Sequence, residues 1–247
     1  MAKNSYIESY ISYQKSTDKS PTTLANYRSD LIQFAIWFEK NYGVDMKLVN
    51  ITPTDARQYK QHLIDSGLRP PTINRRLLSL KYFLEWGWST KKIKYRFPLP
   101  KTVKQSQSIP KWLTRTQQNH LLRHVEQYGS VRDASIVKIL LNTGLRVSEL
   151  CDIKWSHITM SERKGKLLVN AGKGCKYREI PLNKDARIAL FNLDYTLHAG
   201  SDAFVFKGQR GTLTPRGIQL MLNRLNMPGE LSVISPHQLR HTFCKNL

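Results

Sequence analysis

Apolar side chains recur at helical spacing through the first hundred residues, in segments separated by short polar stretches. Between Ser20-Pro21 and Gly43, the residues that follow this spacing are Leu24, Tyr27, Leu31, Phe34, Ala35 and Phe38. Serine followed by proline favours a helix start, because serine caps the first turn and proline fits the first helical position. Thr52-Pro53 repeats the signal, and similar spacing begins near Tyr6 and after Pro70-Pro71. The pattern predicts four short helices packed as a small bundle.

The hydrophobic pattern changes twice in the second half of the chain. Helical spacing continues from Thr114 to Asn142, and a further helix is predicted over Leu145–Ile153. Strand-like runs follow at Ile158-Thr159, Lys166–Asn170 and Tyr177–Leu182. Helices return over Lys184–Leu197, after Thr214-Pro215 and after Ser235-Pro236. We therefore expect a mainly α fold with a small antiparallel β-sheet, divided into a helical N-terminal domain (1–97), a linker (98–110) and an α+β domain (111–247).

Net charge is the most informative feature of the composition. The chain carries +21, of which residues 1–100 contribute +8 and residues 101–247 contribute +13. Such an excess favours a polyanionic partner, and nucleic acid is the first candidate. A membrane partner is disfavoured, because no apolar run approaches the roughly 20 residues that span a bilayer. The N-terminus lacks an apolar signal region and the cysteines are isolated, so we expect a cytoplasmic protein with reduced thiols and no metal site.

A basic stretch joins the two predicted domains. Residues 86–125 contain nine basic and no acidic residues, together with prolines and a polar Gln-Ser repeat. This is the composition of a linker, and it fits either a solvated connector or a segment that lies along DNA. The complete lack of acidic residues favours DNA. The candidate DNA contacts are Lys91, Lys92, Lys94, Lys101 and Lys104, with Arg75, Arg76 and Lys81 on the preceding predicted helix.

Three short motifs supply candidate phosphate-binding cations. Arg146 is predicted in the first turn of a helix, and His237 and Arg240 share a face in the first turns of another. Lys173 lies in a glycine turn between these motifs. Arginine can hold a phosphate through two hydrogen bonds, and a lysine of lowered pKa can protonate a leaving oxygen. Glu149 either orients a neighbouring basic group or forms a local structural ion pair.

Taken in order, these motifs resemble the tyrosine recombinase (phage integrase) family. Its sequence boxes match Thr143–Leu150, Gly172–Pro181 and His237–Phe243. Ser20–Leu31 and Thr72–Leu77 are similar to the family's core-binding domain, so the resemblance covers essentially the whole chain. It implies two domains that clamp double-stranded DNA from opposite sides, and a homotetramer on paired recombination sites.

The resemblance also implies a catalytic set. Arg146 and Arg240 would bind the scissile phosphate, and Lys173 would give a proton to the leaving 5′ hydroxyl. A tyrosine would attack to form a 3′-phosphotyrosine link, which stores the bond energy without a metal or other cofactor. The expected site residues are Arg146, Lys173, His237 and Arg240, supported by Glu149 and by His241, for which a place in the core is an equal alternative.

The family's nucleophilic tyrosine follows the third box, and no tyrosine follows Arg240 in these 247 residues. Tyr177 and Tyr195 lie upstream, in a predicted strand and a predicted helix. We therefore expect this chain to bind DNA without cleaving it, as part of a longer recombinase. The alternative is a DNA-binding regulator that has the fold without the activity. A type IB topoisomerase shares related chemistry but fits the small first domain less well.

Overall fold

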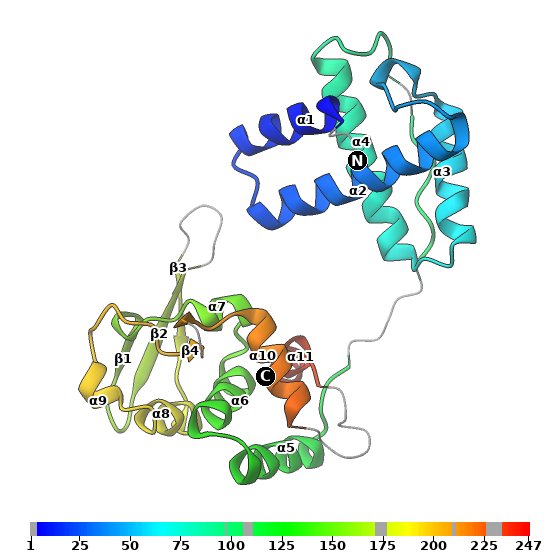
Figure 1. Cartoon of the computed structure of the whole chain (residues 1–247). Coiled ribbons are helices and arrows are strands. Elements are labelled where there is room, and N and C mark those ends of the chain that lie inside the picture. Colours follow the sequence, from blue (N-terminus) through cyan, green and yellow to red (C-terminus); the bar gives the residue numbers. More distant parts are fainter. Residues whose placement is uncertain (1–3, 97, 106–110, 171–176, 209–210, 226–233) are drawn as a thin grey trace. The chain divides into compact units, whose positions relative to one another are not determined.

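The computed structural model describes residues 4–96, 98–105, 111–170, 177–208, 211–225 and 234–247 (Figure 1). The chain divides into two compact units, residues 1–107 and 108–247, and each has its own hydrophobic core. Both units are mainly helical, and the second contains a three-stranded antiparallel sheet. The predicted fold class is confirmed. In the described part of the chain, no helix has both the length and the apolar character that a bilayer crossing requires.

Among its described residues, the first unit has four α-helices and one 3-10 turn: α1 (Ser5–Ser16), α2 (Pro21–Tyr42), η1 (Leu48–Asn50), α3 (Pro53–Asp65) and α4 (Pro70–Ser89). The predicted helix starts are confirmed. The Ser20 side chain accepts a hydrogen bond from the Thr23 backbone nitrogen, and Thr52 forms a complete capping box with Asp55. These caps satisfy backbone groups that a helix start leaves unpaired.

Aromatic side chains fill the core of the first unit. Tyr10, Phe34, Tyr59 and Phe83 are each no more than 1% exposed. The rings of Phe34 and Tyr59 meet edge to face with their centroids 4.9 Å apart, a favoured arrangement for aromatic pairs. The bundle is therefore held together by large rings contributed by all four helices.

Part of the basic stretch packs against the first unit. Leu99 and Val103 contact its hydrophobic core. The Asn74 side chain accepts a hydrogen bond from the Val103 nitrogen (2.8 Å) and donates one to the Val103 carbonyl (2.9 Å). The Lys60 ammonium donates to the carbonyl of Lys101 at 2.8 Å. The segment 99–103 is thus attached to the helices of this unit.

The second unit combines helices with a small sheet. Its first helices are α5 (Arg115–Tyr128), α6 (Val131–Thr143) and α7 (Val147–Cys151). The sheet has the order β1-β2-β3, all antiparallel, with β1 (Ile158–Met160), β2 (Gly165–Asn170) and β3 (Tyr177–Pro181). The other elements are η2 (Trp155–His157), α8 (Lys184–Phe191), α9 (Tyr195–His198), β4 (Lys207–Gly208), β5 (Gly211–Thr212), α10 (Pro215–Arg224) and α11 (Pro236–Asn246).

Helix α6 is the central support of the second unit, and it packs against α5, α8 and α11 (Figure 1). Ile136, Val137, Ile139 and Leu140 on this helix are each no more than 1% exposed. A helix that is apolar around most of its surface is buried in a core, and its end is therefore held in place. The turn that follows α6 carries the first arginine motif.

Two predicted helices differ from the structure. The helix expected over Lys184–Leu197 is divided into α8 and α9, because Asp194 has a left-handed backbone with φ of 62°. That conformation interrupts a right-handed helix. The helix expected over Leu145–Ile153 is confined to α7. The short β4–β5 hairpin was not predicted, because two-residue strands leave no periodic signal.

Candidate phosphate-binding site

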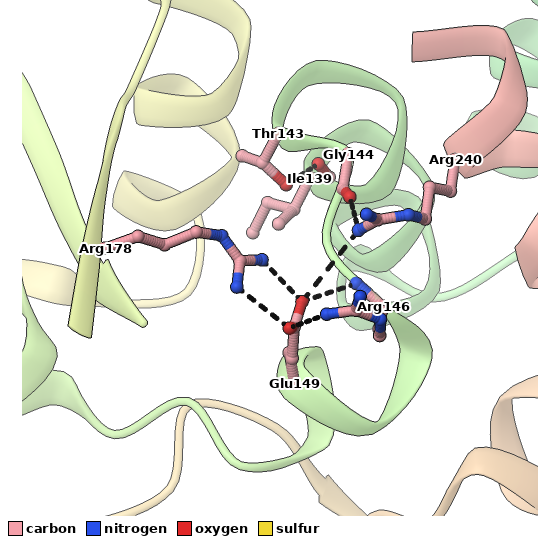
Figure 2. Close-up of polar contacts among 7 residues, drawn as sticks. All are labelled: Ile139, Thr143, Gly144, Arg146, Glu149, Arg178 and Arg240. Atoms are coloured by element: carbon pink, nitrogen blue, oxygen red, sulfur yellow. Dashed lines mark hydrogen bonds and ion pairs between the residues drawn. The ribbon is translucent and has the colours of Figure 1, made fainter. Parts of the chain in front are cut away.

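Gly144 ends helix α6 and begins the first arginine motif. Its φ is +60°, a left-handed value that favours glycine at a helix end. A Cβ atom at this position would lie 2.2 Å from Cδ1 of Phe243 on helix α11. The Gly144 carbonyl accepts a hydrogen bond from Nη1 of Arg240 on the same helix (Figure 2). The glycine therefore lets two sequence-distant motifs approach each other closely.

Arg146 occupies the position before helix α7 and not its first turn as predicted. Its backbone is extended, with φ of −69° and ψ of 149°. Its nitrogen donates to Oε2 of Glu149 at 2.8 Å, and its Nη1 donates to Oε1 at 2.8 Å. The Arg146 side chain is 60% exposed. Glu149 thus holds both the backbone and the guanidinium of Arg146, while more than half of the Arg146 side chain stays open to solvent.

Glu149 is the centre of the site. Its side chain is 9% exposed and also receives Nη1 of Arg178 on Oε1 (3.0 Å) and Nη2 of Arg178 on Oε2 (2.7 Å). Nη1 of Arg240 lies 4.0 Å from Oε2. Figure 2 shows the three guanidinium groups around this one carboxylate, from the α7 start, strand β3 and helix α11. The cluster of three guanidinium groups and one carboxylate carries a net positive charge, which suits an anionic ligand.

The pKa values follow from these contacts. Burial alone would raise the pKa of Glu149, but the hydrogen bonds from Arg178 and then from Arg146 outweigh it and lower that pKa to about 2. The same hydrogen bond to Glu149 raises the pKa of Arg178. The carboxylate and the guanidinium are therefore both charged at neutral pH. Glu149 forms ion pairs with Arg146 and Arg178, and its support of a reaction stays a prediction.

Helix α11 carries His237, Arg240 and His241. Its start is capped by Ser235, whose hydroxyl accepts from the Gln238 nitrogen at 3.2 Å. His237 is exposed and His241 is half-buried, and their rings meet edge to face with centroids 4.2 Å apart. The two histidines therefore share one side of the helix, as their spacing predicts.

Hydrogen bonds also join helix α11 to the start of the second unit. Thr242 is fully buried. Its hydroxyl accepts a hydrogen bond from the Leu113 nitrogen at 2.9 Å and donates one to the Gln238 carbonyl at 2.8 Å. The Gln118 side chain in turn donates to the Leu113 carbonyl at 2.9 Å. These bonds fix the helix, and with it Arg240, against the start of the second unit.

Lys173 lies outside the residues that the structure describes, and its role stays a prediction. Strand β2 ends at Asn170 and strand β3 begins at Tyr177, and Val169 on β2 pairs with Arg178 on β3. Within the described ranges, no group of three or more His, Cys, Asp or Glu side chains is placed to hold a metal ion.

The candidate DNA contacts on helix α4 have partners inside the first unit. Nη1 of Arg75 lies 2.6 Å from Oδ2 of Asp30, and Nε of Arg76 lies 4.0 Å from Oδ1. The Ser79 hydroxyl donates to the same buried Asp30 carboxylate at 2.8 Å. Lys81 is 3.9 Å from Glu85, one helical turn further along. Arg75 and Arg76 therefore compensate a buried carboxylate, which is a structural role that the spacing of residues does not reveal.

The lysines that follow helix α4 are exposed: Lys91, Lys92, Lys94, Lys101 and Lys104. The Lys92 ammonium lies 5.7 Å from the centroid of a Trp86 ring, a cation–π distance. Whether these lysines contact DNA remains a prediction. Their exposure leaves them accessible to an anionic partner.

Of the six site residues predicted in the second unit, the structure brings Arg146, Glu149 and Arg240 together and places the two histidines on the same helix as Arg240. Arg178 was not predicted as a site residue, although it belongs to the second sequence box. Arg178 is 29 positions from Glu149 in the sequence, and no rule of residue spacing predicts contact between a strand and a helix start so far apart. The alternation of side chains along strand β3 could have indicated it, because Arg178 points to the opposite face from the exposed Tyr177 and Glu179.

Comparisons with known proteins show which family the chain resembles. The phage integrase family model matches residues 111–247, and the phage integrase N-terminal SAM-like domain model matches residues 7–91. Tyrosine recombinase XerC of Staphylococcus carnosus (strain TM300) is 30% identical over 237 residues, which cover 92% of this chain and 78% of that protein. The XerC of Staphylococcus aureus (strain MSSA476) is also 30% identical over 237 residues, covering 92% and 77%.

Solved structures share the fold. The Tn1549 transposon integrase in complex with circular intermediate DNA matches 98% of this chain and 85% of its own, with a TM-score of 0.71 and 22% identity. A lambda integrase tetramer bound to a Holliday junction matches 98% of this chain and 71% of its own, with a TM-score of 0.69 and 20% identity. At these identities the likeness concerns the fold alone. The family matches and the recombinase relatives, however, confirm the resemblance found in the sequence, and the chain belongs to the phage integrase family of tyrosine recombinases.

Proposed function

We propose that the chain serves site-specific DNA recombination, such as the integration, excision or resolution of a mobile element. Its second unit would hold the phosphate at which a strand is cut and rejoined. The observation that carries the proposal is the cluster around Glu149, where three arginines from separate elements meet one carboxylate. The relatives named tyrosine recombinase support the same reaction class.

Arg146 and Arg240 are the proposed phosphate ligands. A guanidinium has five N–H donors. In the described part of the chain, the Arg240 side chain gives one hydrogen bond, to the Gly144 carbonyl, and the Arg146 side chain gives one, to Glu149. Most donors of both groups are therefore left for a ligand. Fixed donors of this kind stabilise the charge that develops on phosphoryl oxygens during transfer.

The remaining site residues complete the proposed mechanism. His237, exposed on the same helix as Arg240, would contact the phosphate or the attacking group, and His241 would support its ring. Lys173 would give a proton to the leaving 5′ hydroxyl. A tyrosine would form a 3′-phosphotyrosine intermediate, and the reaction would need no cofactor, because that link keeps the bond energy for rejoining.

The polypeptide of these 247 residues is proposed to bind DNA without cleaving it. Tyr195 is its last tyrosine, and its hydroxyl accepts a hydrogen bond from the Met160 nitrogen at 3.2 Å. Tyr195 is 9% exposed and packs against Trp155, with ring centroids 6.1 Å apart. A buried ring of this kind is a poor nucleophile for a DNA phosphate.

Double-stranded DNA is the proposed partner, and assembly on it would be a homotetramer on paired sites. The charge of +21 supports a polyanionic ligand. The exposed lysines of the 91–104 segment would follow the DNA backbone, while the arginine cluster would hold one particular phosphate. The second candidate function is a DNA-binding regulator with the same fold, which the same positive charge would serve equally well.

Covalent capture separates the two candidates. The protein produced from its complete reading frame would be incubated with a nicked duplex selected from a random pool for tight binding. The recombinase proposal expects a protein–DNA adduct on a denaturing gel, which Arg240→Ala abolishes and the 247-residue polypeptide does not form. A complete protein that binds the duplex tightly and forms no adduct is a regulator.

Salt dependence tests the DNA-binding half of the proposal. The 247-residue polypeptide should lose affinity for duplex DNA steeply as the salt concentration rises, because its lysine and arginine side chains release counterions from the DNA phosphates when they bind. A dissociation constant that hardly changes between low and physiological salt would contradict an electrostatic interface.

A further inference from the structure

We propose that Arg178 is a positioning residue of the phosphate site, a role that rests on the proposed function of Arg146 and Arg240. Its task is to fill half of the acceptor positions of Glu149, so that this carboxylate leaves Arg240 free and takes only one side-chain donor from Arg146. Arg178 reaches the site from strand β3, and it donates to both oxygens of Glu149, at 3.0 and 2.7 Å (Figure 2). This paired geometry is the strongest that arginine forms with a carboxylate.

A count of acceptor sites explains why the second arginine matters. A carboxylate offers about four lone-pair positions. Arg178 fills two of them, and the Arg146 backbone nitrogen and Nη1 fill the other two at 2.8 Å each. Nη1 of Arg240 remains 4.0 Å from the nearest Glu149 oxygen and donates to the Gly144 carbonyl instead. Glu149 therefore has no free position for Arg240 while Arg178 is present.

Removal of Arg178 would change this distribution. Two acceptor positions of a carboxylate that is 9% exposed would lose their donors, and a buried charge without donors is costly. Among the described residues, Arg240 lies beside Glu149 without a hydrogen bond to it, and a shift of about 1 Å would bring Nη1 into hydrogen-bond range of Oε2. A phosphate would then have to compete with Glu149 for the same guanidinium. Arg146 would be drawn into the same competition.

The position of Arg178 suits a fixed donor. It lies in a paired strand opposite Val169, which is buried, so its backbone is held by the sheet. Its side chain is 35% exposed, less than the 60% of Arg146. Arg178 thus faces the carboxylate from the protein side, whereas Arg146 is open to a ligand. The two arginines make similar contacts with Glu149 but have different access to solvent.

Inorganic phosphate is the probe for this inference, and the arginine Nε–Hε signals of the 247-residue polypeptide in NMR are the readout. In the native protein, phosphate should shift the Arg146 and Arg240 signals with a measurable half-saturation concentration. Arg178→Met should raise that concentration about tenfold, which equals about 1.4 kcal/mol. Adding Glu149→Gln to this variant should bring it back to within about threefold of the native value, because the competing charge is gone.

Controls separate positioning from folding and from total charge. Lys166→Met removes a cation that pairs with Glu179 at 2.9 Å on the same two strands, and it should leave the half-saturation concentration unchanged. Arg178→Lys keeps the charge but loses the paired geometry, so it should give an intermediate loss of about threefold. This variant carries the test if Arg178→Met does not fold.

Each result has one meaning. If native protein shows no phosphate shift at Arg146 and Arg240, the proposed phosphate site is wrong, and the role of Arg178 fails with it. If the native protein binds phosphate and folded Arg178 variants bind it equally well, the proposed function stands and the positioning role is overturned. A double variant as weak as Arg178→Met, or a Lys166→Met variant weakened to the same degree, also overturns that role.

Discussion

Both units bury a carboxylate among arginines, Asp30 in the first and Glu149 in the second, yet the two clusters differ in what they leave available. Asp30 is paired with Arg75 and with the Ser79 hydroxyl, and these contacts join helices α2 and α4. Glu149 is surrounded by three guanidinium groups, which together offer more N–H donors than its two oxygens can accept. The first cluster uses its arginines to neutralise a buried charge. The second has an excess of donors, which is what a ligand site needs.

The same difference appears at two helix ends. Gly43 after α2 and Gly144 after α6 both have left-handed backbones, with φ of 68° and 60°. Nothing lies within 4 Å of a Cβ built at Gly43, whereas one at Gly144 meets the Phe243 ring at 2.2 Å. A helix end in the first unit is open to solvent, and its counterpart in the second is covered by the helix that carries Arg240. Similar local elements therefore serve stability in one unit and site assembly in the other.

The largest effect expected from this comparison is at the two glycines. Gly144→Ala should lower the free energy of unfolding of the second unit by about 3 kcal/mol, through backbone strain and overpacking against Phe243. Gly43→Ala should cost the first unit about 1 kcal/mol, from the backbone alone. Urea denaturation of each variant provides the measurement. Equal losses at the two positions would show that Phe243 yields freely and that the close approach is unimportant.

A matched variant isolates the contact with Phe243. The Phe243→Ala protein has no ring for a Cβ at position 144 to meet. In that protein, Gly144→Ala should lower the free energy of unfolding by only about 1 kcal/mol, which is the backbone cost alone. If the cost of Gly144→Ala stays the same without the ring, the backbone conformation is its whole cause.

Asp30→Asn should separate stability from binding. It leaves Arg75 and Arg76 without their charged partner, and we expect a loss of about 2 kcal/mol in the stability of the first unit, less than for a fully buried pair because Arg75 is partly exposed. The affinity of the folded variant for duplex DNA should be unchanged or slightly higher, as one negative charge is removed. A folded variant with strongly weakened DNA binding would place the Asp30 cluster in the DNA interface.

The pH dependence of stability should show the contribution of Glu149, the buried carboxylate of the second unit. The folded-state pKa of Glu149 is lowered to about 2 from the usual value of 4.5, so its contribution to stability is present above pH 4.5 and is lost as the pH falls toward 2. Allowing for solvent screening, the contribution is on the order of 1 kcal/mol. The stability difference between the native protein and Glu149→Gln should shrink over that pH range. A difference that stays constant down to pH 3 would mean that Glu149 is not held as a charged group.

The smallest effects are expected on the salt dependence of DNA binding. Lys94→Gln and Lys104→Gln should each reduce the slope of log affinity against log salt by about 1, if each lysine contacts a phosphate. Arg75→Gln should leave that slope unchanged, because its side chain is committed to Asp30. Filter binding at several salt concentrations gives the slopes. A reduced slope for Arg75→Gln would show that Arg75 serves DNA as well as Asp30.

Local signals in the sequence predicted the parts of the fold that depend on neighbouring residues. Ser20-Pro21 and Thr52-Pro53 start helices where expected, because a cap is a contact within one turn. The break at Asp194 was missed, since an aspartate is compatible with a helix and the left-handed conformation is fixed by its surroundings.

The site shows the same limit. Arg146, Glu149 and Arg240 were predicted because they belong to short recognisable motifs. The partners of Arg75 and the contact between Arg178 and Glu149 were not predicted, because each joins residues at least 29 positions apart. Sequence spacing carries no information about which strand faces which helix start, and packing of the unit decides it.

The hydrogen bond between Leu113 and Thr242 has a consequence for the order in which the second unit forms. It joins residues 129 positions apart, and the contact of Arg240 with Gly144 joins residues 96 apart. Contacts that close such long loops cost the most chain entropy and form slowly. We expect pulsed hydrogen exchange during refolding to protect α6 before α11, and simultaneous protection would contradict this order. A chain that is still folding would then attract DNA by its charge before it can hold a single phosphate.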